Sequence, residues 1–160
     1  MCEKIKSEKM AEVEVDTETG IVRVLKVVAV HDVGKALNQT QVEGQIAGGV
    51  TQGIGHALLE DLELHEGRIK NPALSSYLIP TALDVPDIEA FFVEDPECTG
   101  PFGAKGLGER AMLPTVAAII NVIDDAVGVR ITSLPATPEK ILEGLAEKKE
   151  VTSTNSEGRR

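Results

Sequence analysis

Residues 11–30, AEVEVDTETGIVRVLKVVAV, and residues 42–59, VEGQIAGGVTQGIGHALL, decide the fold of this 160-residue chain. The first stretch alternates apolar and polar residues on either side of Thr19-Gly20, which predicts a β-hairpin. Its second arm becomes almost wholly apolar, as a buried strand would. The second stretch has the length of a helix but contains five glycines. So many glycines are costly in a helix unless they let another backbone or a ligand approach closely.

The rest of the chain predicts further elements, which share turn or capping residues at their ends: a strand pair around Glu66-Gly67, an extended loop over 71–88, a strand over 88–94, an apolar helix over 113–127 closed by Gly128, a short strand after it, and a short helix from Thr137-Pro138. We therefore expect an α+β domain of mixed strands with a glycine-rich helix and an apolar C-terminal helix. The predicted domain covers 11–147, between a flexible leader over 1–10 and a disordered polar tail over 148–160.

Composition limits the classes of function. The chain is 42% hydrophobic and 26% charged, with a formal net charge of −10, so it offers no basic stripe for binding nucleic acid. No apolar run approaches the roughly 20 residues that span a bilayer, and the N-terminus lacks the apolar stretch of a signal peptide. Cys2 and Cys98 form neither a disulfide framework nor a metal-ligand motif. We expect a cytoplasmic protein that binds neither nucleic acid nor membrane.

A second glycine-rich stretch, TGPFGAKGLGERAML, covers residues 99–113. Its glycines fit a tight turn, an anion cradle before a helix, or a wall against a flat cofactor. The stretch lacks the Gly-Lys-Ser/Thr ending of a P-loop and the spacing of a dinucleotide-binding fingerprint. Lys105 would add charge to an anion site. Glu109 fits either a stabilising acid at the start of a helix or a carboxylate with a chemical role.

The glycines of the predicted helix leave two interpretations open. Gly44, Gly48 and Gly55 follow at spacings of four and seven, and Gln45 and Gln52 lie seven apart. On a helix these positions fall close to one face. Such a face suits tight packing through small residues. It also suits a heterocyclic cofactor, because each glutamine offers both a hydrogen-bond donor and an acceptor.

Four motifs in register resemble the molybdenum hydroxylases, the family of xanthine dehydrogenase, aldehyde oxidoreductase and carbon monoxide dehydrogenase large subunits. The motifs are HDVGKALNQTQVEGQIAGGVTQGIGHALLE, NPALSSYLIPTALDVP, GPFGAKGLGE and GVRITSLPATPEKIL. The resemblance runs from about Ala11 to Leu145 and concerns the C-terminal part of the molybdopterin-binding subunit. One departure is Gln39, which stands where the family usually carries proline after the asparagine.

The resemblance places six residues at the site and implies a role for five of them. Glu109 falls on the glutamate that acts as general base beside the molybdenum. Gln45 matches a glutamine that contacts the pterin, and Gly44 belongs to the same motif. Gly106 and Gly108 would let the loop backbone approach the cofactor. Lys105 shares that loop without an assigned role, and the resemblance implies no protein ligand to the metal.

By the same resemblance, the chain would contribute to hydroxylation of a heterocycle or aldehyde carbon with oxygen from water. The cofactor would be molybdopterin with molybdenum, in its plain or cytosine dinucleotide form. Iron–sulfur and flavin groups would lie on partner chains, beside the remaining molybdopterin-binding segment. The chain could be a separate subunit, a truncated product or a cut piece. The alternatives are a non-catalytic fold without cofactor, which would self-associate through the surfaces that the remaining molybdopterin-binding segment would cover, and an anion-binding module.

Overall fold

The computed structural model describes residues 7–157, with side chains described for residues 7–150. Strands β1 (Ser7–Val15) and β2 (Val22–Asp32) form the predicted antiparallel hairpin, with Gly20 in the turn at a φ of 74°. Strand β5 (Asp87–Val93) lies parallel to β2 on its other side, so the sheet order is β1-β2-β5. The predictions of the hairpin and of this third strand are confirmed.

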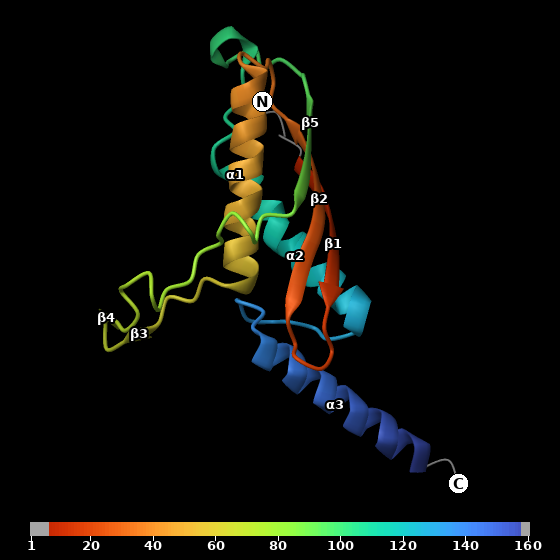
Figure 1. Cartoon of the computed structure of the whole chain (residues 1–160). Helices are drawn as coiled ribbons and strands as arrows, with labels where there is room; N and C mark the ends of the chain where they lie inside the picture. Colours follow the sequence, from red (N-terminus) through yellow and green to blue (C-terminus); the bar gives the residue numbers. More distant parts are fainter. Residues whose placement is uncertain (1–6, 158–160) are drawn as a thin grey trace.

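Two helices cover one face of the sheet (Figure 1). Helix α1 (Gln39–Leu58) begins at Asn38, whose side chain accepts a hydrogen bond from the Gln41 N–H, and lies against β5. Helix α2 (Leu113–Val127) lies against β1 and ends at Gly128, which has the left-handed φ of 64° that favours glycine. The core between the layers is aliphatic, and its fully buried members include Val27, Ala29, Ile46, Val50, Ile119 and Ile123. The α+β class predicted from the sequence is confirmed.

The segment between α1 and β5 forms an arm that projects from the body (Figure 1). It contains the short strands β3 (Leu64–His65) and β4 (Arg68–Ile69), joined by Glu66 and Gly67 with positive φ angles of 49° and 77°. The predicted strand pair at this place is confirmed. Asn71 holds the base of the hairpin, donating to the Asp61 carbonyl and accepting from the Glu63 N–H.

The two ends of the chain differ from the sequence predictions. Strand β1 begins at Ser7, because the second hairpin arm is long enough to pair with residues 7–10 of the expected leader. Helix α3 (Pro138–Glu157) is longer than the predicted short helix and continues through 148–157, where we expected disorder. Lys148, Lys149 and Glu150 are good helix formers and carry the helix past the predicted end, whereas helix propensity does not explain its continuation through residues 151–157, VTSTNSE. Residues 1–6 and 158–160 lie outside the described residues.

The predicted short strand after Gly128 is wrong. Residues 129–136 form an irregular connection to α3 and pair with no strand of the part of the chain that the structure describes. The segment is held instead by burial of Val129 and by the Ala136 N–H, which donates to the Ala57 carbonyl at 2.7 Å. No helix among the described residues is long and apolar enough to cross a membrane.

Candidate functional site

The upstream half of the glycine loop is tied to the residues that follow β2. The Gly103 carbonyl accepts hydrogen bonds from the N–H groups of Lys35, at 2.8 Å, and Glu97, at 3.0 Å. The Lys105 N–H donates to the Val33 carbonyl at 3.0 Å. Gly103 itself has a φ of 81°, a backbone conformation that side chains rarely adopt. This half of the loop is therefore fixed by its own hydrogen bonds.

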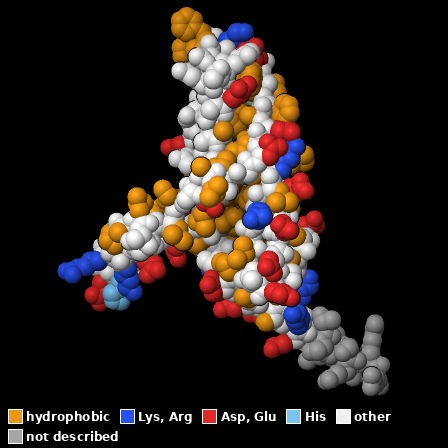
Figure 2. Space-filling model, viewed as in Figure 1, with side chains coloured by type: hydrophobic (Ala, Val, Ile, Leu, Met, Phe, Trp, Pro, Cys, Tyr) orange, Lys and Arg blue, Asp and Glu red, His pale blue; other side chains and the backbone are white. Residues whose placement is uncertain are grey.

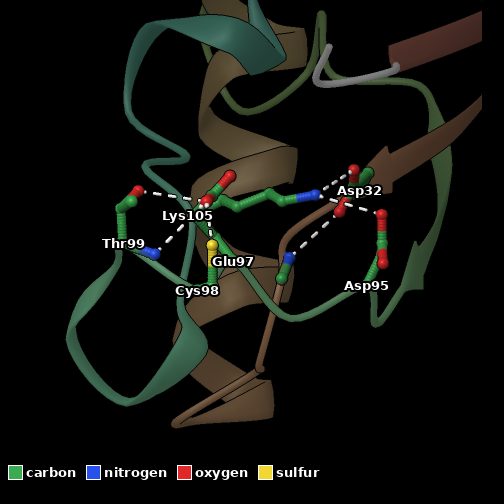
Figure 3. A network of polar contacts seen from close by, with 7 residues as sticks. Asp32, Asp95, Glu97, Cys98, Thr99 and Lys105 are labelled. Carbon is green, nitrogen blue, oxygen red and sulfur yellow. Dashed lines mark hydrogen bonds and ion pairs between the residues drawn. The ribbon is translucent and has the colours of Figure 1, made fainter. Parts of the chain in front are cut away.

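The side chain of Lys105 points inward, away from any external ligand (Figure 3). It is 1% exposed, and its Nζ lies 2.7 Å from Asp32 Oδ2 and 3.4 Å from Asp95 Oδ2. The hydrogen bond from Lys105 to Asp32 raises the pKa of the lysine. Partial burial would raise the pKa of Asp32, but hydrogen bonds from Lys105 and the Gly34 N–H outweigh it and lower that pKa. Both groups are charged at neutral pH, and the charge of Lys105 is balanced inside the protein.

The downstream half of the loop is anchored at Ala111, which is fully buried in the short 3₁₀ helix η2 (Glu109–Ala111). A Cβ built on Gly49 would overlap Ala111, so α1 and η2 touch through a bare backbone. On the other side, the Lys9 ammonium donates to the Ala111 carbonyl and, at 2.5 Å, to Thr115 Oγ1. Burial lowers the pKa of Lys9 to about 8. Ala111 is thus held between α1 and β1.

Between these anchors, the loop is open to its surroundings. A Cβ on Gly106 or Gly108 would meet no atom within 4 Å. Glu109 is exposed and has no hydrogen-bond or ion-pair partner among the described residues. Leu107 packs against the edge of the core and holds the middle of the segment. The open glycines and a free carboxylate follow one another on the same stretch.

Helix α1 carries glycines of two kinds. Gly49 and Gly53 are buried and pack directly on Ala111 and Thr115. Gly44 and Gly48 are exposed on the opposite side of the helix, and a Cβ there would meet nothing within 4 Å. The exposed Gln45 stands next to this open pair. In Figure 2 the part of the molecule over α1 is largely free of hydrophobic and charged side chains.

The contact between α1 and η2 brings the predicted residues of the two motifs together. Gln45 precedes Gly49 by about one helical turn, and Glu109 lies two positions before Ala111. Because Gly49 touches Ala111, both Gln45 and Glu109 lie near this crossing. Figure 1 shows the segment before α2 running alongside α1. Five predicted residues, Gly44, Gln45, Gly106, Gly108 and Glu109, are exposed around the crossing, whereas Lys105 is directed inward.

Two hollows lie near α1, and neither contains Glu109. The larger, about 770 Å³, lies between β2, the end of α1 and residues 83–87, with a mainly apolar lining that includes Ile54, Leu58 and Val85. A smaller one of about 360 Å³ lies between α1 and β5 and includes Gly44 in its lining. Figure 2 shows hydrophobic side chains where the arm meets the body, near the larger hollow. The candidate site is therefore an open surface in this chain.

The histidines do not form a metal centre. Within residues 7–150, no three His, Cys, Asp or Glu side chains group in a way that could hold a metal ion. His31 is buried in β2 with its Nδ1 2.9 Å from Ser7 Oγ, while His56 and His65 are exposed on α1 and β3.

Sequence reasoning missed Asp32, the residue that receives Lys105. The signal was present in the His31-Asp32-Val33-Gly34 turn, where an aspartate at a strand end commonly accepts backbone hydrogen bonds. Asp32 Oδ1 accepts from the Gly34 N–H at 3.1 Å. Its second partner, Lys105, lies 73 positions along the chain and no local pattern indicates it.

Comparisons with known proteins identify the family of the chain. Residues 8–86 match the family described as Molybdopterin cofactor-binding domain. The chain is 45% identical over 137 residues to an aldehyde oxidoreductase of Megalodesulfovibrio gigas, covering 85% of this chain and 15% of that relative. It is 41% identical over 124 residues to a putative xanthine dehydrogenase molybdenum-binding subunit of Escherichia coli, covering 76% and 16%. The chain belongs to the molybdenum hydroxylase family.

Solved structures of this family carry the same fold. The chain superposes on quinoline 2-oxidoreductase from Pseudomonas putida 86 with a TM-score of 0.80 at 42% identity, over 86% of this chain and 18% of the other. The chain thus spans about one sixth of the length of the molybdenum hydroxylases that it matches. Its open surface fits the family's cofactor: bare backbone at the exposed glycines can lie against a flat ring, and the free amide of Gln45 can pair with a heterocycle edge.

Proposed function

We propose that this chain forms one wall of the molybdopterin site of a molybdenum-dependent hydroxylase and supplies its general base. The observation that carries the proposal is the free, exposed carboxylate of Glu109, beside two open glycines and close to the α1 crossing. A structural acid at a helix start would not need bare backbone on its upstream side. Family membership supports assigning this surface to the cofactor.

Each residue would contribute through its own chemistry. Glu109 has no partner among the described residues, so its carboxylate is available to accept a proton from a group held beside it. Gln45 would bind an edge of the pterin with its amide donor and acceptor. Gly44, Gly106 and Gly108 would leave room for the ring and its substituents. Lys105 would act within the loop, because its ammonium already binds two carboxylates.

The bound cofactor, in either the plain or the cytosine dinucleotide form, would supply the redox chemistry that oxidises a heterocycle or aldehyde carbon with oxygen from water. The open surface requires a second wall, which we assign to the remaining part of the molybdenum-binding subunit. Iron–sulfur and flavin partners would carry the electrons away. The E. coli relative is itself named a molybdenum-binding subunit.

The test replaces Glu109 by glutamine in the complete molybdenum enzyme that contains this chain. We expect hydroxylation of aldehydes and N-heterocycles to fall by about 100-fold or more, because general-base catalysis contributes on that order. Molybdenum per protein, measured by elemental analysis, should stay nearly unchanged. Gln45→Ala should do the opposite and lower molybdenum retention more than turnover per bound metal.

A matched control is Glu14→Gln, which removes an exposed carboxylate from the hairpin end of β1. It should leave both activity and metal content unchanged. Loss of molybdenum together with activity in Glu109→Gln would make Glu109 structural. Full activity of Glu109→Gln would remove the general-base assignment. Native protein purified without molybdenum would favour the alternative of a non-catalytic fold that has lost its cofactor.

A further inference from the structure

The loop that carries Glu109 is held in its middle by Leu107 and at two outer points, and the two outer attachments differ in kind. Downstream, Ala111 is buried in a packed contact with Gly49. Upstream, the only side chain that ties residues 103–106 to the body is Lys105, which is 1% exposed, within the described part of the chain. Between them lie Gly106 and Gly108, two residues without side chains to restrict the backbone. The path of the segment therefore depends on both ends.

Asp32 is the centre of the upstream attachment (Figure 3). One of its oxygens accepts from Lys105 Nζ at 2.7 Å, and the other accepts from the Gly34 N–H at 3.1 Å. The positive charge of Arg110, the residue directly after Glu109, also acts on Asp32. The Asp32 carboxylate thus binds the ammonium of Lys105, which precedes Glu109, and its pKa is lowered further by the charge of Arg110, which follows Glu109.

Burial makes this attachment more specific than a surface ion pair. Exposed ion pairs are screened by solvent and mobile. The side chain of Lys105 is 1% exposed, so its ammonium has few alternative partners. Asp95, 66% exposed, lies farther away at 3.4 Å and completes the set of partners. The ammonium also cannot reach the open surface on which Glu109 stands without leaving both carboxylates.

We propose that Lys105 and Asp32 form a clamp that positions Glu109, and that Lys105 is a positioning residue and not a cofactor ligand. The inference rests on the proposed function for its effect on turnover. The clamp itself is a property of this chain and can be measured without cofactor. Removing it should let Gly106 and Gly108 sample other conformations, and a small displacement of a catalytic group reduces rate strongly.

The first experiment measures hydrogen exchange of the backbone amides of residues 103–110 in the chain. Lys105→Met should raise exchange in this segment by at least about tenfold, while Lys105→Arg, which can still pair with Asp32, should restore most of the protection. The control is Lys26→Met, which removes a partly exposed ion pair to Glu89 in the middle of β2. It should leave exchange of residues 103–110 unchanged. Equal exchange in Lys105→Met and the wild type would overturn the clamp.

The second experiment measures kcat per bound molybdenum and KM in the complete enzyme. Lys105→Met and Asp32→Asn should each lower kcat by about 10- to 100-fold with little change in KM or metal content. The double variant should be no worse than either single variant, because both remove one interaction. Partial recovery of kcat in Lys105→Arg separates positioning from a general loss of folding.

The outcomes distinguish the two proposals. If Lys105→Met loses molybdenum while kcat per metal is unchanged, Lys105 serves cofactor binding and the clamp proposal is wrong. Additive losses in the double variant would also overturn it. If Glu109→Gln keeps full activity while Lys105→Met raises loop exchange, the general-base proposal fails and the clamp remains as a structural device.

Discussion

Helix α1 carries glycines on two sides, and the surroundings of the glycines on the two sides are opposite. On the packed side, Gly49 and Gly53 remove side chains so that Ala111 and Thr115 can touch the helix backbone. On the open side, Gly44 and Gly48 remove side chains where nothing in the chain approaches within 4 Å. The first pair is explained by the fold of this chain. The second pair has a helix-propensity cost and no internal contact that offsets it, which is why we assign it to a ligand.

The largest effect should come from the packed side. In Gly49→Ala, the added methyl would overlap Ala111, with the backbone carbon of Ala111 at only 2.9 Å, so neither residue can move aside without shifting η2. We expect the free energy of unfolding to fall by about 3 kcal/mol, at the upper end of overpacking effects. Urea denaturation of the chain measures it.

A double variant sharpens this result. Ala111→Gly removes the methyl that Gly49→Ala would meet, although the Ala111 backbone remains close. The combination should therefore recover part of the lost stability, a coupling visible in a double-mutant cycle. A Gly49→Ala chain as stable as the wild type would show that the two sides of α1 do not differ in packing.

This comparison also shows what the sequence can and cannot predict. The hairpin, α1 and α2 follow from local periodicity and capping, so Gly20 and Gly128 were placed correctly. The role of a helical glycine depends on its neighbours in space. Gly55 has the spacing of the open face, yet it lies beneath Glu60 and Pro80 because the arm returns there.

The residues of the candidate site also fall into those that could be predicted from the sequence and those that could not. The family resemblance places Gln45 and Glu109 on the two motifs, and the structure brings these motifs to one crossing. The inward direction of Lys105 could not be predicted, since its partner Asp32 is distant in sequence. The extent of α3 was missed for another reason: residues 151–157, VTSTNSE, are polar and poor helix formers, so local sequence favours disorder over a helix there.

A second prediction concerns the titration of His31, which is buried in β2. His31 is 1% exposed, its Nε2 has no hydrogen-bond partner among the described residues, and Lys9 lies near it. Burial, assisted by the charge of Lys9, lowers its pKa from 6.5 to about 4. Between these two values the unfolded chain binds more protons than the folded chain, so stability must rise with pH and then level off above 6.5.

The expected gain is about 3 kcal/mol, because the pKa falls from 6.5 to about 4 and each tenfold change in proton affinity is worth about 1.4 kcal/mol. Unfolding free energies measured across this range should show it, and His31→Leu should flatten the slope. The exposed His56→Gln is the control, and it should keep the slope of the wild type. An unchanged slope in His31→Leu would mean that carboxylates, and not His31, cause the pH dependence of stability.

The smallest effect on stability should come from the open side, and its sign should be reversed. In Gly48→Ala the new methyl would meet nothing within 4 Å, so the helix should gain the propensity difference of about 0.5–1 kcal/mol. Urea denaturation of the chain, with Gly49→Ala as the opposite case, measures this gain. In the complete enzyme, the same methyl would stand on the surface assigned to the cofactor and should lower molybdenum content. A variant that is more stable as a chain and poorer in metal as an enzyme would mean that this face is covered in the enzyme, by the cofactor or by the second wall that holds it. Normal metal content would leave Gly48 without an assigned contact.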